Sequence, residues 1–194
     1  MIECQDVSFS YPASTLPDSE RQAGGALKHI SCTIEDGSFV LLCGTSGCGK
    51  TTMTRLFNGL IPHYHEGTYT GSVYLDGKDT RDLSLFDISL KVGSVFQNPR
   101  SQFFNVDTTS ELAFGPENHG IAEDLVRDRV KRVAAQLKLE PLLDRSIFSL
   151  SGGEKQKIAC GSAAAIDPDI YVLDEPSYNL DAYAIADFRQ LLFT

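Results

Sequence analysis

The 194-residue sequence lacks a surplus of basic residues, and this absence narrows the classes of function that fit it. Lysine and arginine together number 17 against 26 aspartates and glutamates, which gives a formal net charge of −9. A nucleic-acid-binding domain normally carries a basic face, and a protein held on a membrane by charge needs a basic patch. The composition therefore supports neither class.

Long apolar runs are also lacking. No stretch approaches the roughly 20 apolar residues that span a bilayer, and the first residues, MIECQDVSFSY, have neither the basic start nor the apolar segment of a signal peptide. We therefore expect any work at a membrane to be done through a partner. The cysteines do not have the spacing of metal ligands, and we expect them to be reduced thiols. They are Cys4, Cys32, Cys43, Cys48 and Cys160.

The remaining composition, 42% apolar and 22% charged, is that of an ordinary globular domain. In the first half, alternation predicts a strand over 2–11, and turn-forming residues predict a loop over 12–25. Two strands are expected around the turn at 35–37, the second ending in the apolar run Phe39–Cys43.

The second half has a more helical character. A strand is predicted over Val92–Gln97, and Thr108 with Glu111 has the spacing of a helix capping box. Apolar residues at 126, 130, 133 and 137 predict an amphipathic helix. A further helix to about Ile166 and an apolar strand over Ile170–Leu173 follow.

The clearest motif is GTSGCGKT, residues 44–51, which fits G-x-x-x-x-G-K-[ST] between a predicted strand and a predicted helix. Glycines let successive backbone N–H groups converge on phosphate oxygens, and the helix that follows adds positive potential. Lys50 would reach the outer phosphates, and the Thr51 hydroxyl would bind magnesium. The predicted nucleotide-binding residues here are Gly44, Thr45, Ser46, Gly47, Cys48, Gly49, Lys50, Thr51 and Thr52.

A second motif places acids at the end of an apolar strand, in IYVLDEP. Asp174 can hold a magnesium ion beside a phosphate-binding loop. Glu175 can orient or deprotonate an attacking water. Together the two motifs indicate a nucleotide hydrolase or phosphotransferase, a class that includes GTPases, small-molecule kinases, helicases and transport ATPases.

A third motif separates these classes. LSGGEKQ, residues 150–156, matches the signature of the ATP-binding subunits of ABC transporters, which the whole chain resembles. Gln97 lies where the family has its Q-loop glutamine, and NLD, residues 179–181, resembles the D-loop. Tyr11 lies where an aromatic residue stacks on adenine in the family.

The resemblance implies an α/β fold, the P-loop NTPase of ABC type. Its core sheet would be mostly parallel, with an antiparallel β subdomain and an inserted α-helical subdomain. Residues 1–194 would form a single ABC-type ATP-binding domain, incomplete at its carboxyl end. About 1–98 and 167–194 would form the core with the β subdomain, and about 99–166 the helical subdomain with the signature.

The resemblance also implies roles and partners. In the family two domains pack head to tail, so the signature of one completes the nucleotide site of the other, and the expected cofactors are ATP and Mg²⁺. The expected partners are a second ATP-binding subunit, in a homodimer or a heterodimer, and transmembrane transporter subunits. No nucleic-acid partner is expected. The domain would lie peripherally on the cytoplasmic face of the cell membrane. Implied catalytic residues are Glu175, Lys50 and Gln97; implied metal ligands are Thr51, Gln97 and Asp174; further nucleotide contacts are Tyr11, Ser151, Gly152, Gly153 and Asp181.

A narrower resemblance is carried by FQNPRSQFFNVDTTSELAFGPENHGI, GLIPHYHEG and DGKDT. These segments are similar to the ATPases of energy-coupling-factor importers and of related cobalt and nickel systems, which take up vitamins and metal ions. Two positions depart from that pattern: Arg100 stands where an acidic residue is common, and Tyr178 where a small residue is usual.

The family's histidine that contacts the outer phosphate lies beyond the D-loop helix, and none of the four histidines here lies after Asp181. We therefore expect a shortened form or a natural fragment that binds Mg-ATP more readily than it hydrolyses it. Two alternatives to a transport ATPase stay open: a hydrolysis-deficient nucleotide-binding module, and a soluble ABC-type ATPase of DNA repair or chromosome maintenance. The compact segment between Gln97 and Ser151 and the negative charge favour transport.

Overall fold

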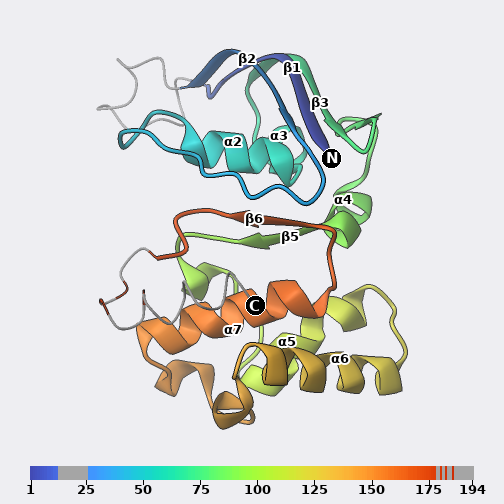
Figure 1. The fold of residues 1–194 in the computed structure, drawn as a ribbon, viewed down its shortest axis with the longest axis vertical. Coiled ribbons are helices and arrows are strands. Elements are labelled where there is room, and N and C mark those ends of the chain that lie inside the picture. Colours follow the sequence, from blue (N-terminus) through green and yellow to red (C-terminus); the bar gives the residue numbers. More distant parts are fainter. Residues whose placement is uncertain (13–25, 178–179, 181, 183–184, 186–194) are drawn as a thin grey trace. The chain divides into compact units, whose positions relative to one another are not determined.

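The computed structural model describes residues 1–12, 26–177, 180, 182 and 185. The chain divides into two compact units, unit 1 over Met1–Val92 and unit 2 over Gly93–Thr194. The elements of both are shown in Figure 1. Within the described ranges, no helix has the length and apolar character needed to cross a membrane.

Unit 1 contains an antiparallel sheet in the order β2-β1-β3-β4. Alternation buries Ile2 and Cys4 in the first half of β1 and Val7 and Phe9 in the second. The alternation changes phase at Asp6, whose φ of 49° lies in a shift of the strand register. The strands are β1 Ile2–Ser10, β2 Ala26–Ile34, β3 Thr68–Leu75 and β4 Lys78–Asp79.

The described part of unit 1 also contains the helices α2 Lys50–Phe57, α3 Leu60–His63 and α4 Leu85–Lys91. The sheet lies on one side of α2 and α3 (Figure 1). Helix α2 buries Met53, Leu56 and Phe57, and the sheet buries Val7 and Val73. Removal of these side chains from water is the main stabilising contribution in unit 1.

One predicted strand of unit 1 is wrong. Residues 38–45 belong to no helix or strand, and the apolar run Phe39–Cys43 takes part in neither sheet of the described residues. Phe39 is 67% exposed and Leu41 75% exposed. An apolar run becomes a buried strand only when neighbouring strands pair with both of its edges, and the described strands do not pair with this run.

Unit 2 combines a strand pair with helices and short 3₁₀ turns. Strands β5 and β6 lie side by side, and α7 lies between them and the helices α5 and α6 (Figure 1). The strands are β5 Val92–Val95 and β6 Ile170–Leu173; the helices are α5 Thr108–Asn118, α6 Glu123–Gln136 and α7 Gly152–Ala165; the turns are η1 Pro99–Ser101, η2 Glu140–Leu142 and η3 Ile147–Ser149.

Helix α7 is covered on two sides because its apolar residues do not form a single stripe. Ala159, Cys160 and Ala163 pack in a cluster with Val95 of β5. Ile158 packs in a second cluster with residues of α5 and α6. A Cβ at Gly161 would lie 2.7 Å from side-chain carbons of Leu112 and Leu139, so this close approach of helices requires glycine. The predicted helical periodicity of α6 is confirmed by burial of Val126, Val130 and Val133.

The predicted capping box of α5 is wrong by one residue. Asp107 is the N-cap, and its carboxylate accepts a hydrogen bond of 2.8 Å from the Ser110 N–H. The Thr108 hydroxyl donates to the Leu142 carbonyl instead. Glu111 is 2% exposed, and its Oε2 accepts from the backbone N–H groups of the preceding loop at Phe104 and Asn105, at 3.0 and 2.8 Å.

Candidate functional site

The glycine-rich loop of unit 1 leads directly into helix α2. Gly49 is the N-cap of this helix with φ 102°, and Gly47 has φ 78°, conformations that favour glycine. The Lys50 ammonium turns back over the loop and donates to the carbonyls of Gly44 and Thr45, at 3.1 and 3.2 Å. The loop therefore presents a lysine and a helix amino terminus on the same concave stretch of backbone, which is the arrangement that binds phosphate groups.

The loop is tightly closed at its beginning. A Cβ at Gly44 would lie 2.4 Å from the sulfur of Cys48, so a larger residue would require the Cys48 side chain to move. The side chains at the tip, Thr45 to Cys48, are exposed, whereas Thr52 is 7% exposed within α2. A ligand could therefore reach the tip of the loop, whereas the Thr52 side chain is buried.

Tyr11 follows β1 and is half-buried. Its hydroxyl accepts a 2.8 Å hydrogen bond from Arg55 of α2, and its ring contacts Phe9 and His65 edge-on, at centroid distances of 4.8 and 6.1 Å. Burial, and next the Arg55 guanidinium, lower the pKa of His65. Arg55, Phe9 and His65 thus hold Tyr11 in position, and the stacking of Tyr11 on adenine stays a prediction.

The acidic strand end lies in unit 2. Asp174 follows β6, is 7% exposed, and donates its backbone N–H to the Val95 carbonyl of β5 at 2.9 Å. Glu175 has a left-handed φ of 46° and is exposed. The Gln97 carboxamide donates to Glu175 Oε2 at 3.1 Å. The structure thus brings together Gln97 and Glu175, two residues predicted to act in catalysis.

The signature sequence begins helix α7. Ser151 is the N-cap in a complete capping box: its hydroxyl accepts from the Glu154 N–H at 3.3 Å, and its N–H donates to Glu154 Oε2 at 2.7 Å. Hydrogen bonds to the Glu154 carboxylate from the Ser151 backbone N–H and side chain, with Arg145 close by at 3.1 Å, lower the pKa of Glu154. Ser151 and Gly152 are exposed and Gly153 is half-buried. The helix amino terminus is therefore formed and open to solvent.

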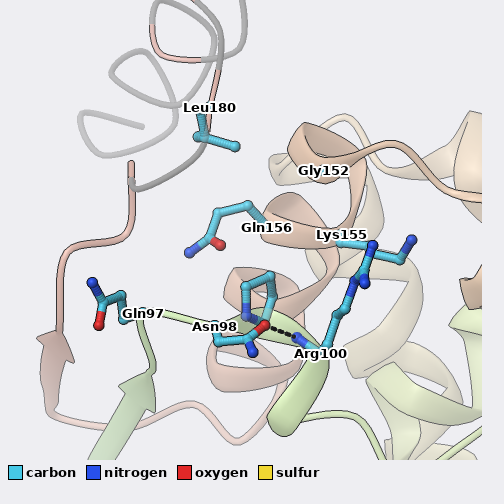
Figure 2. A pocket seen from close by; sticks show the side chains of 8 residues that line it. Gln97, Asn98, Arg100, Gly152, Lys155, Gln156 and Leu180 are labelled. Carbon is cyan, nitrogen blue, oxygen red and sulfur yellow. Dashed lines mark hydrogen bonds between the residues drawn. The ribbon is translucent and has the colours of Figure 1, made fainter.

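A pocket of about 470 Å³ in unit 2 separates the Gln97 segment from the first turns of α7 (Figure 2). The carboxamide of Gln156 points into it. Gln156 is 1% exposed, and its Nε2 has no hydrogen-bond partner in the part of the chain that the structure describes. The lining residues are Gln97, Asn98, Pro99, Arg100, Gly152, Lys155, Gln156 and Leu180.

Sequence reasoning missed Gln102, which holds the signature helix to the strand that precedes Gln97. Its Oε1 accepts from the Phe96 N–H at 3.2 Å, and its Nε2 donates to the carbonyls of Ser94 and Ala159 at 3.3 and 3.4 Å. No periodicity or spacing marks this residue. Its only sequence signal is its place in FQNPRSQFF, just after Gln97.

The predicted site residues fall into two groups. Unit 1 holds Tyr11 and Gly44 to Thr52, and unit 2 holds Gln97, Ser151 to Gly153, Asp174 and Glu175. Asp181 of the predicted D-loop, and Tyr178, lie outside the described residues. A magnesium site shared by Thr51, Gln97 and Asp174 therefore stays a prediction, and the described residues contain no group of three or more histidines, cysteines or acids that could hold a metal ion.

Comparison with known families decides the identity of the domain. The family described as ABC transporter matches residues 27–178. The chain belongs to this family. Its ABC-type P-loop NTPase fold, with an antiparallel sheet and helices, is confirmed by solved structures. One is CbiO1 from Clostridium perfringens, described as part of the ABC transporter complex CbiONQ, with a TM-score of 0.79, 27% identity, and coverage of 98% of this chain and 71% of that one.

Other members are similar along the whole ABC domain. The cassette MJ0796, solved as a dimer bound to ADP and Pi, has a TM-score of 0.78 and 25% identity, over 99% of this chain and 81% of that one. A protein of Treponema denticola, named as an ABC transporter ATP-binding protein, is 47% identical over 192 residues. One from Pyrococcus horikoshii, similarly named, is 44% identical over 93% of this chain and 61% of its own length. This match covers 99% of the present chain but 38% of the Treponema protein, so the chain spans well under half the length of that relative.

Proposed function

We propose that this ABC domain binds Mg-ATP and is the energising part of a membrane importer. The observation that carries the proposal is the conformation of the glycine-rich loop. Gly49 caps α2 with φ 102°, and Lys50 is held over the loop by the carbonyls of Gly44 and Thr45. A triphosphate would take the place of those carbonyls as partner of the ammonium, and the α2 amino terminus would add backbone donors.

The residues present fit this ligand. The loop turns tightly at Gly44, where a Cβ would lie 2.4 Å from the Cys48 sulfur. A bound Mg²⁺ would supply Lewis-acid stabilisation of the phosphate charge, with Thr51, Gln97 and Asp174 as the proposed ligands. Oxygen donors of this kind are the ones that magnesium prefers.

We assign Glu175 as the residue that orients and deprotonates the attacking water, and Gln97 as its positioning partner. The Glu175 carboxylate accepts a 3.1 Å hydrogen bond from Gln97 Nε2 at Oε2, and in the proposed role it would also accept a hydrogen bond from the attacking water. The left-handed backbone at Glu175, φ 46°, sets the direction of this side chain directly after β6. A non-glycine residue in this conformation is uncommon, and such conformations cluster at functional sites.

The signature is proposed to complete the nucleotide site of a second subunit, packed head to tail. In support, the capping box uses the Ser151 and Glu154 N–H groups, while Gly152 and Gly153 supply first-turn N–H groups that have no partner inside the helix. An anion at this end of α7 is stabilised by the helix dipole. The similar cassette MJ0796 was solved as a dimer.

The transport partner and solute are the finer part of the proposal. The similarity to CbiO1, described as part of an ABC transporter complex, favours an energy-coupling-factor type of importer for vitamins or metal ions. The domain would then attach peripherally to transmembrane subunits on the cytoplasmic face of the membrane. Co-purification with integral membrane proteins from the native cell is the direct measurement of this step.

Mg-ATP binding is tested by fluorescence titration with a ribose-labelled ATP analogue. Lys50→Ala is expected to weaken binding at least tenfold, because it removes the ammonium that pairs with the outer phosphates. Lys28→Ala, on the exposed side of β2, is the matched control and should bind as the unmodified chain does. Equal affinities for the two variants would contradict the proposed site.

Pairing is tested separately by analytical ultracentrifugation of the Glu175→Gln variant, which should retain the ATP that bridges two copies. ATP is expected to shift the chain from monomer to dimer, and Ser151→Trp should abolish that shift without affecting labelled-ATP binding. A chain that binds ATP yet stays monomeric would favour the alternative of a nucleotide-binding module without transport coupling. Phosphate release measured on the unmodified chain, with Glu175→Gln as the inactive control, distinguishes an active ATPase from a hydrolysis-deficient one.

A further inference from the structure

Two cysteines face each other across the edge of the sheet in unit 1. Cys4 of β1 is paired directly with Cys32 of β2 in the antiparallel ladder, between the pairs Glu3 with Thr33 and Ile2 with Ile34 on one side and a register shift on the other. Directly opposite residues in such a ladder point to the same face, with Cα atoms about 4.5 to 5.5 Å apart. That spacing lies inside the range of about 4.4 to 6.8 Å that a disulfide spans.

The register pair places the two thiols close enough to interact. Burial, followed by the neighbouring Cys32 thiol, raises the pKa of Cys4 to about 12. Cys4 is buried at 3% exposure, whereas Cys32 is exposed on β2, the edge strand of the sheet. One sulfur is therefore open to a reagent from solvent, and the other is held close behind it.

The remaining cysteines lack this arrangement. All five cysteines of the chain are free thiols. Cys160 is buried in α7 of unit 2, and its pKa is likewise raised to about 12 by burial. Cys43 and Cys48 are exposed in the segment that leads into α2. Among the strand pairings of the described sheet, only Cys4 and Cys32 bring two cysteines to the same register position.

We propose that Cys4 and Cys32 form a dithiol oxidation site that closes to a cross-strand disulfide when it meets a low-molecular-weight disulfide such as oxidised glutathione. In the first step the Cys32 thiolate attacks one sulfur of the oxidant, and one glutathione thiolate leaves. Cys32 then carries a mixed disulfide. In the second step Cys4 attacks the Cys32 sulfur and the second glutathione leaves as its thiolate, which takes up the Cys4 proton.

The balance of this reaction is complete. Two protein thiols are oxidised, one S–S bond forms between them, and the two electrons reduce one glutathione disulfide to two thiols. The first step depends on the exposure of Cys32, and the second on the position of Cys4 directly opposite Cys32 in the ladder. The bond would fasten the edge strand β2 to β1 and constrain the chain across residues 5–31. Neither step uses ATP, so this site is independent of the proposed transport function.

The experiment treats the purified full chain with oxidised glutathione, blocks remaining thiols by alkylation, and maps peptides by mass spectrometry without reduction. The expected product is one peptide pair joined through Cys4 and Cys32, lighter by two hydrogen atoms and separated again by dithiothreitol. The Cys43→Ser variant is the control for an exposed cysteine and should give the same product.

Two further variants separate the steps. Cys32→Ser should abolish the linked pair and leave Cys4 alkylated only after unfolding. Cys4→Ala should instead trap glutathione as a mixed disulfide on Cys32, and circular dichroism will show whether this variant is folded. The proposal is overturned if the unmodified chain accumulates glutathione on Cys32 without linking it to Cys4, or if the linked product joins a different pair of cysteines.

Discussion

The carboxamide nitrogen of Gln97 lies 3.1 Å from Oε2 of Glu175, although 78 residues separate the two positions in the chain. The contact exists because Asp174 donates its backbone N–H to the Val95 carbonyl, which aligns the end of β6 with the end of β5. Both side chains then extend beyond the strand pair at the same edge. The register of β5 against β6 therefore determines whether the proposed catalytic carboxylate has its neighbour.

Replacement of Gln97 by glutamate should introduce a charge repulsion that salt weakens. The new carboxylate would lie beside that of Glu175, and at pH 7 we expect a loss of about 0.5 to 1 kcal/mol in the free energy of unfolding at this partly exposed position. Urea unfolding at low and at high salt is the measurement, because salt screens the interaction between exposed charges. Gln97→Met, which removes the hydrogen bond without adding charge, should show a loss that does not change with salt.

The capping box at the start of α7 should make the stability of the folded protein depend on pH. The Ser151 N–H and hydroxyl hold the pKa of Glu154 below its ordinary value of 4.5. A carboxyl group whose pKa is lowered by folding stabilises the protein above that ordinary value, and this contribution is lost as the pH falls through the folded pKa. Glu154→Gln should therefore destabilise at pH 7 and much less near pH 2. Thermal unfolding of the variant and of the unmodified chain at pH 7 and near pH 2 is the measurement. An equal loss of stability at both pH values would contradict this role of Glu154.

Ser151→Ala tests the other half of the same box. The side-chain oxygen accepts from the Glu154 N–H, and loss of such a cap typically costs about 1 kcal/mol. Ser151→Asp retains an acceptor at the cap and should recover most of that stability. Both comparisons concern unfolding alone, so they are separate from the proposed role of Ser151 at a second subunit's nucleotide. Equal stability of the alanine and aspartate variants would show that the cap is unimportant.

Substitution by methionine should have different effects on stability at two glutamines, Gln102 and Gln156. Gln102→Met removes hydrogen bonds to Phe96, Ser94 and Ala159, and should destabilise by about 1 to 3 kcal/mol. Gln156→Met removes a buried donor that has no partner among the described residues, so it should be neutral or slightly stabilising. Chemical denaturation of the two variants side by side provides the measurement. A larger loss at Gln156 than at Gln102 would contradict this account.

Glu111 should be required for the order of the loop before α5. Its carboxylate accepts from the N–H groups of Phe104 and Asn105, and it is almost fully buried. Glu111→Ala would leave both donors without a charged acceptor, at a cost of about 1.5 to 3 kcal/mol. Amide hydrogen exchange should show faster exchange at these two positions in the variant. Glu117→Ala, on the exposed side of α5, is the control and should leave their exchange unchanged.

Features that depend on neighbours along the chain were predictable from the sequence. The glycine-rich loop with its lysine and the amphipathic α6 both formed as the sequence indicated, because a left-handed glycine and a helical stripe need only residues a few positions apart. The assignment to the ABC family followed from the glycine-rich loop, the signature and the acidic strand end. The carboxylate after β6 could also be located, since it directly follows an apolar run.

Features that join distant parts of the chain were decided by the tertiary structure alone. The capping residue of α5 is Asp107, because Thr108 is engaged by Leu142 and Glu111 by the preceding loop. Gln102 had no signal of its own, since its partners are Ser94 of β5, Phe96 just after that strand, and Ala159 of α7. The sequence by itself determined the local motifs and the family; only packing and strand register, which act between residues tens of positions apart, decided which side chains meet.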